Sequence, residues 1–311
     1  MKKKTDYRNA FFDEFYSLAS KDKNVVFLSA DTDADSLIKF RNNFPKQFYN
    51  TGVTEQNSVT VAAGLALSGK KVFVYSMVPF ITMRCFEQIK IDICSMKLPV
   101  CLIGLGTGLS FSHYGPAGHG VIDIAIMRTL SEMTILNPSD PLSASQCARI
   151  AYKNKIPTYV RLHKTQSENI YKNFSNFNND FNLINKGDDA AIITTGLMTS
   201  TSIKVVNHFK KNNLKIALID FLKLNPINKK YLIKELKKYR KVITVEDNIY
   251  TGGLGSLVSE VILDHGLNIK LKRIALKNEQ CFDYGNLDWI YKKHNLDMNG
   301  IIKQIREFLK H

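Results

Sequence analysis

The sequence lacks any apolar run approaching the roughly 20 residues that a membrane-spanning helix needs. Its N-terminus, residues 1–6, is basic, but a polar and aromatic segment follows it in place of the apolar centre of a signal peptide. Both absences argue against a membrane or secreted protein. We therefore expect a soluble, cytoplasmic chain with no membrane partner.

Cysteine is scarce, and no Cys-x-x-Cys pair occurs. An odd number of cysteines without that spacing argues against a disulfide framework and against a zinc site. The histidines and aspartates form no convergent set in the sequence, so we predict no metal site in this chain. The thiols are expected to be reduced and mostly buried; they are Cys85, Cys94, Cys101, Cys147 and Cys281.

Acidic residues are also in the minority, since 43 Lys and Arg face 28 Asp and Glu and give a net charge of +15. Much of the excess is lysine in helical segments such as 229–238, where apolar residues keep helical spacing and lysines fill the outer face. This pattern predicts a solvated surface and no nucleic-acid partner. The charge would also favour sugar phosphates or an acidic partner chain.

The first half of the chain alternates short apolar runs with helical stretches, which is typical of a doubly wound α/β sheet. We expect buried parallel strands at 24–29, 71–76, 99–104, 133–137 and 158–162, and helices at 86–97 and 140–154.

A second α/β unit follows a change in composition. Residues 166–186 are polar and Asn-rich, and we interpret them as a linker outside any sheet. Strands are then expected at 190–196, 215–220 and 241–245 and a helix at 199–212. The sequence thus predicts two doubly wound α/β domains, 1–165 and 187–311.

Glu55 lies at the end of the segment Thr-Gly-Val-Thr-Glu, residues 51–55, and precedes a run of small residues at 58–66. This arrangement resembles the pyrimidine-binding domain of transketolases, 1-deoxyxylulose-5-phosphate synthases and 2-oxo acid dehydrogenase beta chains. The resemblance implies that Glu55 binds the aminopyrimidine N1′ of thiamine diphosphate and is catalytic by activating it. A buried acid suits this role, because apolar surroundings bias its protonation.

Two further segments resemble cofactor-binding parts of this family. Residues 75–89 resemble the segment that places an aromatic ring against the aminopyrimidine. The resemblance implies Phe80 as the cofactor contact, with Ile81 or Thr82 as alternative contacts. A purely structural role, in which Phe80 packs in the core, is the other alternative. In the loop after the first strand, where α/β folds bind ligands, the family implies Asp31, Asp33 and Ser36 near the thiazolium and the substrate. We assign Asp31 to the cofactor and Ser36 to the substrate. Helix capping is the alternative there.

The glycine-rich loop 104–120 departs from the family pattern. Relatives usually read Gly-Pro-Thr-His, whereas Ala117 and Gly118 stand here at the last two positions. Either His119 acts as the catalytic histidine in a shifted loop, or the donor chemistry differs. We predict His119 as catalytic and His113 as a substrate contact; solvent-facing or partner-facing histidines are the alternative.

Arg161 lies at the end of the strand 158–162, where relatives bind the substrate phosphate. A planar guanidinium suits a phosphate or carboxylate, and a structural ion pair is the alternative. The last 120 or so residues resemble the transketolase C-terminal domain. There Glu246 and Gly252-Gly253 are expected to hold a loop and a helix start at a domain or subunit contact.

The family's Gly-Asp-Gly motif, which supplies ligands of the Mg²⁺ that holds the diphosphate, is missing; residues 186–189 are the nearest match. The chain is also about half as long as a complete transketolase. We therefore expect the C-terminal subunit of a split enzyme. A partner, the N-terminal transketolase subunit, would carry the diphosphate and Mg²⁺ site in an α2β2 assembly.

The resemblance implies transfer of a two-carbon ketol unit from a ketose or ketose phosphate donor to an aldehyde acceptor. Decarboxylation of a 2-oxo acid is the alternative, as in dehydrogenase beta chains or deoxyxylulose phosphate synthases. A non-catalytic scaffold subunit is the third interpretation.

Overall fold

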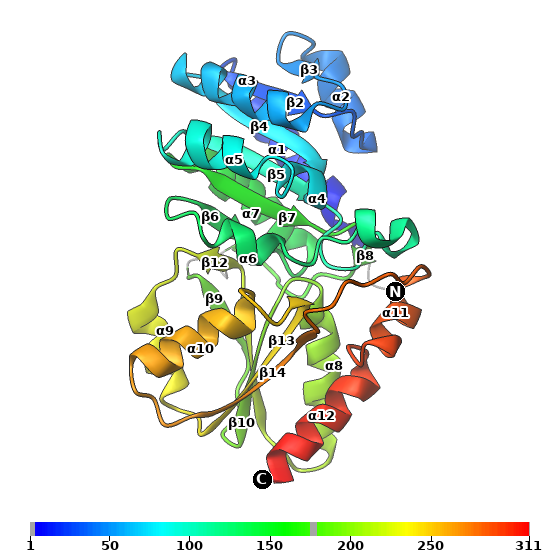
Figure 1. Ribbon diagram of the computed structural model, residues 1–311, viewed down its shortest axis with the longest axis vertical. Helices are drawn as coiled ribbons and strands as arrows, with labels where there is room; N and C mark the ends of the chain where they lie inside the picture. Colours follow the sequence, from blue (N-terminus) through cyan, green and yellow to red (C-terminus); the bar gives the residue numbers. More distant parts are fainter. Residues whose placement is uncertain (1–3, 175–178, 311) are drawn as a thin grey trace.

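The computed structural model describes residues 4–174 and 179–310 and contains two α/β domains stacked along the long axis (Figure 1). The N-terminal half, blue to green, forms the upper domain, and the C-terminal half, green to red, forms the lower one. The predicted fold class is confirmed, since each domain has helices on both faces of a mostly parallel sheet. None of the helices within the described ranges is long and apolar enough to cross a bilayer.

The first domain is built on a seven-stranded sheet in the order β12-β6-β7-β5-β4-β2-β3. All neighbours are parallel except β12 and β6. The strands are β2 (Val25–Ser29), β3 (Phe48–Asn50), β4 (Lys71–Met77), β5 (Val100–Leu105), β6 (Thr134–Leu136), β7 (Thr158–Leu162) and β12 (Lys223–Asn225). The helices are α1 (Tyr7–Ala19), α2 (Asp35–Asn43), α3 (Glu55–Leu67), α4 (Val78–Ile81), α5 (Phe86–Gln88), α6 (Asp123–Met127) and α7 (Pro141–Lys153).

The helices divide between the two faces because alternate strand residues point to opposite sides. Aromatic side chains of α1 and α2 pack on one face, together with α7. On the other face α3 presents small residues, so it lies close against the sheet. The expected helix at 86–97 is α5 followed by a π-helix, η1 (Ile89–Cys94). All five cysteines are unpaired and four are buried, as predicted.

The second domain has a five-stranded sheet in the order β14-β13-β10-β11-β9, in which only β9 is antiparallel. Its strands are β9 (Phe181–Asn185), β10 (Ala190–Thr195), β11 (Ile216–Phe221), β13 (Lys241–Ile249) and β14 (Lys270–Leu276). Its helices are α8 (Met198–Lys211), α9 (Lys229–Leu236), α10 (Leu254–Asp264), α11 (Leu287–Lys293) and α12 (Met298–Lys310). Helices α8, α11 and α12 cover one face, and α9 and α10 cover the other.

The expectation that residues 166–186 stay outside every sheet is wrong. Strand β9 forms the edge of the second sheet, and β8 (Gln166–Ser167) pairs with β1 (Thr5–Asp6). An edge strand pairs with one neighbouring strand and is only partly buried, so its sequence need not be continuously apolar. This is why β9 shows no continuous apolar run. Part of the Asn-rich stretch, 175–178, lies outside the described residues. The predicted domain bounds, 1–165 and 187–311, stay predictions.

Several contacts join the two domains. Strand β12 comes from the second half of the chain but extends the first sheet. Within the second domain, Glu246 fixes the start of α10, since it accepts hydrogen bonds from Leu254 N at 2.8 Å and Gly255 N at 2.7 Å. Arg128 of the first domain donates to the carbonyl of Gly252. The prediction that Glu246 and Gly252-Gly253 organise a helix start at a domain contact is confirmed.

Gly108 sits at the same domain contact and leaves no room for a side chain. Its φ is +57°, and a Cβ there would lie 2.0 Å from Asp247 Oδ2. Since Asp247 is buried, it cannot retreat into solvent. The loop after β5 therefore approaches β13 as closely as glycine permits.

Replacing Gly108 with alanine is expected to destabilise the chain more than the same change at Gly69. Gly69 also has a positive φ, but a Cβ added there would meet no atom within 4 Å. Alanine at Gly69 should therefore cost only the backbone strain, about 1–2 kcal/mol. Overpacking at Gly108 should add about 1 kcal/mol or more. Urea unfolding followed by circular dichroism measures both; equal losses would contradict the close contact with Asp247.

Candidate functional site

All the predicted site residues lie at or beyond the carboxyl ends of neighbouring parallel strands. Asp31 follows β2, Glu55 follows β3 and Phe80 follows β4. The loop with the two histidines follows β5, and Arg161 belongs to β7. The parallel registers of these strands bring their carboxyl ends to one edge of the sheet. This edge is where open α/β sheets bind ligands.

Glu55 is the first residue of α3, and its side chain is only 2% exposed. Its Oε1 accepts a hydrogen bond from Ser76 Oγ at 3.3 Å, and its Oε2 accepts one from Arg84 Nη1 at 2.7 Å. The first position of a helix also favours a negative charge. The carboxyl group is therefore held in one orientation by β4 and by the segment after α4.

Arg84 is a candidate site residue to which the sequence pattern assigned no role. The prediction placed Glu55 in apolar surroundings, but the structure places a guanidinium and a hydroxyl against it. Arg84 also covers Phe80, with its guanidinium carbon 4.2 Å from the ring centroid. An arginine four residues after the aromatic residue was the available signal. Because Arg84 is 43% exposed, it can shift away from the ring.

Asp31 and Ser36 lie in the neighbouring loop and helix. Asp31 has a φ of +52° and accepts a hydrogen bond from Asn50 Nδ2 at 3.0 Å. Ser36 lies in the first turn of α2 and is half-buried. Asp31 is exposed, so it faces the solvent side of the site edge. Their roles toward cofactor and substrate stay predictions.

The glycine-rich loop separates the two histidines. His119 is 4% exposed and, among the described residues, has no hydrogen-bond partner at either ring nitrogen. Burial lowers the pKa of His119, which keeps the imidazole neutral near pH 7. His119 lines a cavity of about 270 Å³ together with Met83, the neighbour of Arg84. His113 is exposed and packs its ring against Tyr114 at 4.4 Å.

Gly118 explains why this loop departs from the expected pattern. A Cβ at Gly118 would lie 2.7 Å from Tyr114 Cβ and 3.1 Å from the carbonyl oxygen of Phe111. A histidine side chain at this position does not fit the observed loop. The buried imidazole of this loop is that of His119, one residue later.

Arg161 is fully buried and bound to Asp123 by two hydrogen bonds. Its Nε donates to Asp123 Oδ2 at 2.6 Å and its Nη2 to Oδ1 at 3.0 Å. Tyr159 donates to the same carboxylate at 2.6 Å. Arg161 therefore forms the structural ion pair that was the alternative to a phosphate-binding role. Arg161 Nη1 has no partner within the described ranges, so a substrate contact there stays a prediction.

The structure thus brings together Glu55, Ser76, Arg84 and Phe80 as one cluster. His119 lines a cavity together with Met83, the neighbour of Arg84, and this cavity connects His119 to the cluster. Within the described part of the chain, neither His113 nor Arg161 forms a hydrogen bond or ion pair with Glu55. The cluster can hold the polar edge of a flat ring by the carboxyl group and its face by Phe80.

The pairing of Glu55 with Arg84 predicts an energetic coupling between them. Arg84→Met should lower the free energy of unfolding by about 1–2 kcal/mol, because it leaves a buried carboxylate without its charged partner. Arg84 is partly exposed, so this decrease should be smaller than for a fully buried ion pair. In the Glu55→Gln background the same change should cost at least about 1 kcal/mol less. Thermal unfolding of the four proteins measures the coupling.

Arg41→Met is the control, since Arg41 and Asp33 form an exposed ion pair at 3.4 Å. That change should stay within about 0.5 kcal/mol. If Arg84→Met cost the same with and without the carboxylate of Glu55, the pairing would carry no energy.

Comparison with known proteins agrees with this geometry. A family model described as the transketolase pyrimidine-binding domain matches residues 3–169, and one described as the transketolase C-terminal domain matches residues 180–301. The chain is 33% identical over 307 residues to a protein of Methanocaldococcus jannaschii named as a transketolase C-terminal section, covering 97% of this chain and 96% of that protein. It is 29% identical over 306 residues to a Phocaeicola vulgatus protein named as one of the subunits of an apulose-4-phosphate transketolase, with 97% of each covered.

In longer relatives, the chain spans about half of the length. A 1-deoxy-D-xylulose-5-phosphate synthase of Clostridium tetani is 30% identical over 305 residues, which are 97% of this chain and 49% of that protein. Among solved structures, a split-gene transketolase described as an inactive beta4 tetramer has a TM-score of 0.87 at 25% identity, with 98% of each chain covered. The two family models and the full-length relatives lead to one conclusion: the chain belongs to the transketolase family.

Proposed function

We propose that this chain is the C-terminal subunit of a two-chain, thiamine-diphosphate-dependent transketolase. It would transfer a two-carbon ketol unit from a ketose or ketose phosphate to an aldehyde. Support comes from two relatives of comparable length, one named as a transketolase C-terminal section and the other as one subunit of a transketolase. The single observation that carries the proposal is the buried carboxyl group of Glu55 at the site edge, beside Phe80 and Arg84.

The residues present fit the pyrimidine half of thiamine diphosphate. Glu55 offers a carboxyl group shielded from water, and Phe80 offers an aromatic face that the partly exposed Arg84 side chain covers. When bound, the cofactor supplies a nucleophilic carbon for cleavage of the bond next to a ketone. Glu55 would hold a proton at the pyrimidine N1′, while Ser76 keeps the carboxyl group oriented.

The loop histidines and Arg161 would act on the substrate side. His119 is buried, and that burial lowers its pKa, so its imidazole would accept a proton in the cavity that it lines. Arg161 holds the loop through the carbonyl of Gly120 at 3.5 Å and through Asp123. In this proposal Arg161 positions the loop, and its Nη1 would bind a substrate oxygen.

We further propose that the diphosphate and its Mg²⁺ are held by an N-terminal transketolase subunit in an α2β2 assembly. The outer surface of α3 and η1 supports a partner at this place. Apolar side chains are exposed on both elements, Leu67 at 64% on α3 and Ile91 at 52% on η1, and Val53, just before α3, is exposed at 67%. This surface begins beside Glu55, so a partner that covers it would close the cofactor site.

Decarboxylation of a 2-oxo acid is a second candidate function. The observation that favours it is Gly118, where the loop has no room for the histidine expected in sugar-transferring relatives. The similarity to 1-deoxy-D-xylulose-5-phosphate synthases also supports it. Pyruvate and a ketose phosphate, supplied as alternative donors to the reconstituted complex, distinguish the two reactions.

Substitution of Glu55 tests the proposed activation role. In the complex with its partner, Glu55→Gln should lower kcat by roughly 10²–10⁴-fold, the usual contribution of a positioned acid or base. Glu307→Gln, at an exposed glutamate of α12, is the matched control and should leave turnover unchanged. Unchanged turnover of Glu55→Gln would rule out the role and leave a scaffold subunit as the better interpretation.

A further inference from the structure

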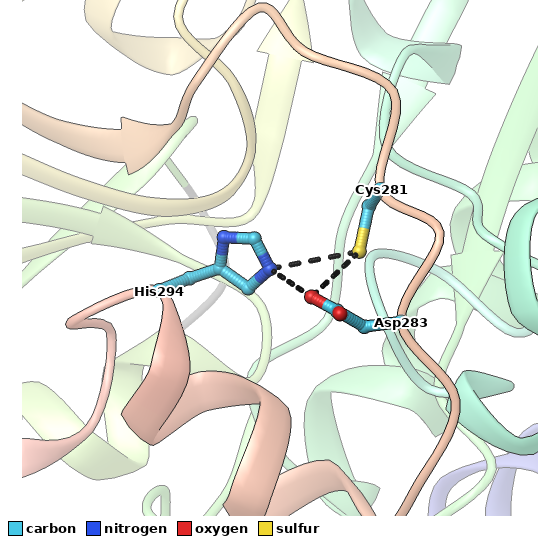
Figure 2. Close-up of side chains that lie close together, drawn as sticks. All are labelled: Cys281, Asp283 and His294. Carbon is cyan, nitrogen blue, oxygen red and sulfur yellow. Dashed lines mark hydrogen bonds and ion pairs between the residues drawn. The ribbon is translucent and has the colours of Figure 1, made fainter.

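Three potential metal ligands converge in the second domain, away from the Glu55 cluster. Cys281 and Asp283 belong to the segment that connects β14 to α11, and His294 directly follows α11. Figure 2 shows their side chains pointing toward one another from these two segments. One ligand atom of each residue lies within 4.8 Å of the other two. Exposed Phe282 and Tyr284 flank Asp283, so the ligand side chains alternate with outward ones.

The spacing of the three ligand atoms matches a tetrahedral zinc centre. Cys281 Sγ lies 3.5 Å from His294 Nε2 and 3.8 Å from Asp283 Oδ2, and the nitrogen and oxygen are 3.1 Å apart. Ordinary zinc bond lengths and tetrahedral angles require about 3.6, 3.6 and 3.4 Å for these three pairs. The protein therefore already holds the edges of one coordination face.

A catalytic thiol relay does not explain this arrangement. A cysteine–histidine–carboxylate relay uses the two ring nitrogens of histidine separately, one for the thiol and one for the carboxylate. Here both contacts go to Nε2 of His294. Convergence of sulfur and oxygen on one nitrogen is instead the geometry of ligands that share a central ion.

We propose that Cys281, Asp283 and His294 bind Zn²⁺, with a fourth position open to water or another ligand. A thiolate with an imidazole selects zinc over the Mg²⁺ of the cofactor site, because Mg²⁺ prefers oxygen ligands. Lys293 Nζ holds the other carboxylate oxygen, Asp283 Oδ1, at 2.5 Å, which orients Oδ2 toward the ion. All three ligand residues line a cavity of about 300 Å³, so an outside ligand can reach the open position.

The zinc site would fasten the segment that supports the histidine loop. Tyr284 packs against Gly115, where a Cβ would lie 2.3 Å from the Tyr284 ring, and Ser112 donates to the carbonyl of Gly285 at 2.6 Å. Cys281 also lines the cavity that contains His119. Zinc at this place links α11 to the segment 281–285 and, through it, to the loop of His119.

This proposal departs from the sequence prediction of no metal site. The pattern Cys281-x-Asp283 with His294 eleven residues later contains no Cys-x-x-Cys pair, and a carboxylate is the least specific zinc ligand. Only the fold brings His294 back to the other two residues.

Metal titration of the purified full chain tests the site. After removal of metals with a chelator, Zn²⁺ should bind with one ion per chain and protect residues 112–117 and 281–285 from hydrogen exchange. Co²⁺, used as a probe, should give the absorption of tetrahedral cobalt with a sulfur-to-metal charge-transfer band. Cys281→Ser should abolish that band, and His294→Ala should weaken Zn²⁺ binding by roughly 100-fold or more, since outer contacts alone carry roughly 10- to 100-fold.

His265→Ala, at an exposed histidine of the same domain, is the control and should bind Zn²⁺ like the unaltered chain. The circular dichroism spectrum of each variant is compared with that of the metal-free chain, which separates a folding defect from loss of a ligand. If Cys281→Ser or His294→Ala does not fold, Asp283→Asn replaces it. Absence of stoichiometric Zn²⁺ binding would overturn the proposal. So would equal affinity in the unaltered, Cys281→Ser and His294→Ala chains.

Discussion

The burial of one carboxyl group at the edge of a parallel sheet is the constraint on which the candidate site depends. Glu55 has almost no contact with water, and its two oxygens are held by Ser76 and Arg84. A buried carboxylate without partners costs several kcal/mol, so β4 and the segment after α4 must supply both contacts. Phe80 lies between these two segments, in α4. Electrostatic satisfaction of Glu55 therefore also fixes the ring face beside it.

The sequence predicted what depends on local pattern. The apolar runs at 24–29, 71–76 and 158–162 became β2, β4 and β7, and parallel pairing brought their ends together. Strand β9 was missed because an edge strand lacks a continuous apolar run. Strand β12 was missed because its partner, β6, lies far earlier in the chain. Strands β7 to β11 come between the two.

The partners of charged groups could not be predicted, because they are set by tertiary contacts. The resemblance assigned Arg161 to a substrate phosphate, with an ion pair as the alternative, and Asp123 holds its guanidinium in two hydrogen bonds. Arg84 had no assigned role within the segment 75–89 until the fold placed it on Glu55. Gly118 suggested a lost histidine, and the space around it shows that no side chain fits there.

Whether a second chain completes the cofactor site can be measured by calorimetry of the separate and combined chains. Thiamine diphosphate with Mg²⁺ would be titrated into this chain, into its candidate N-terminal partner and into the complex of both. We expect tight binding by the complex and none by this chain alone, because the described residues would supply the pyrimidine half of the site. Tight binding by this chain alone, or no binding by the complex, would contradict it.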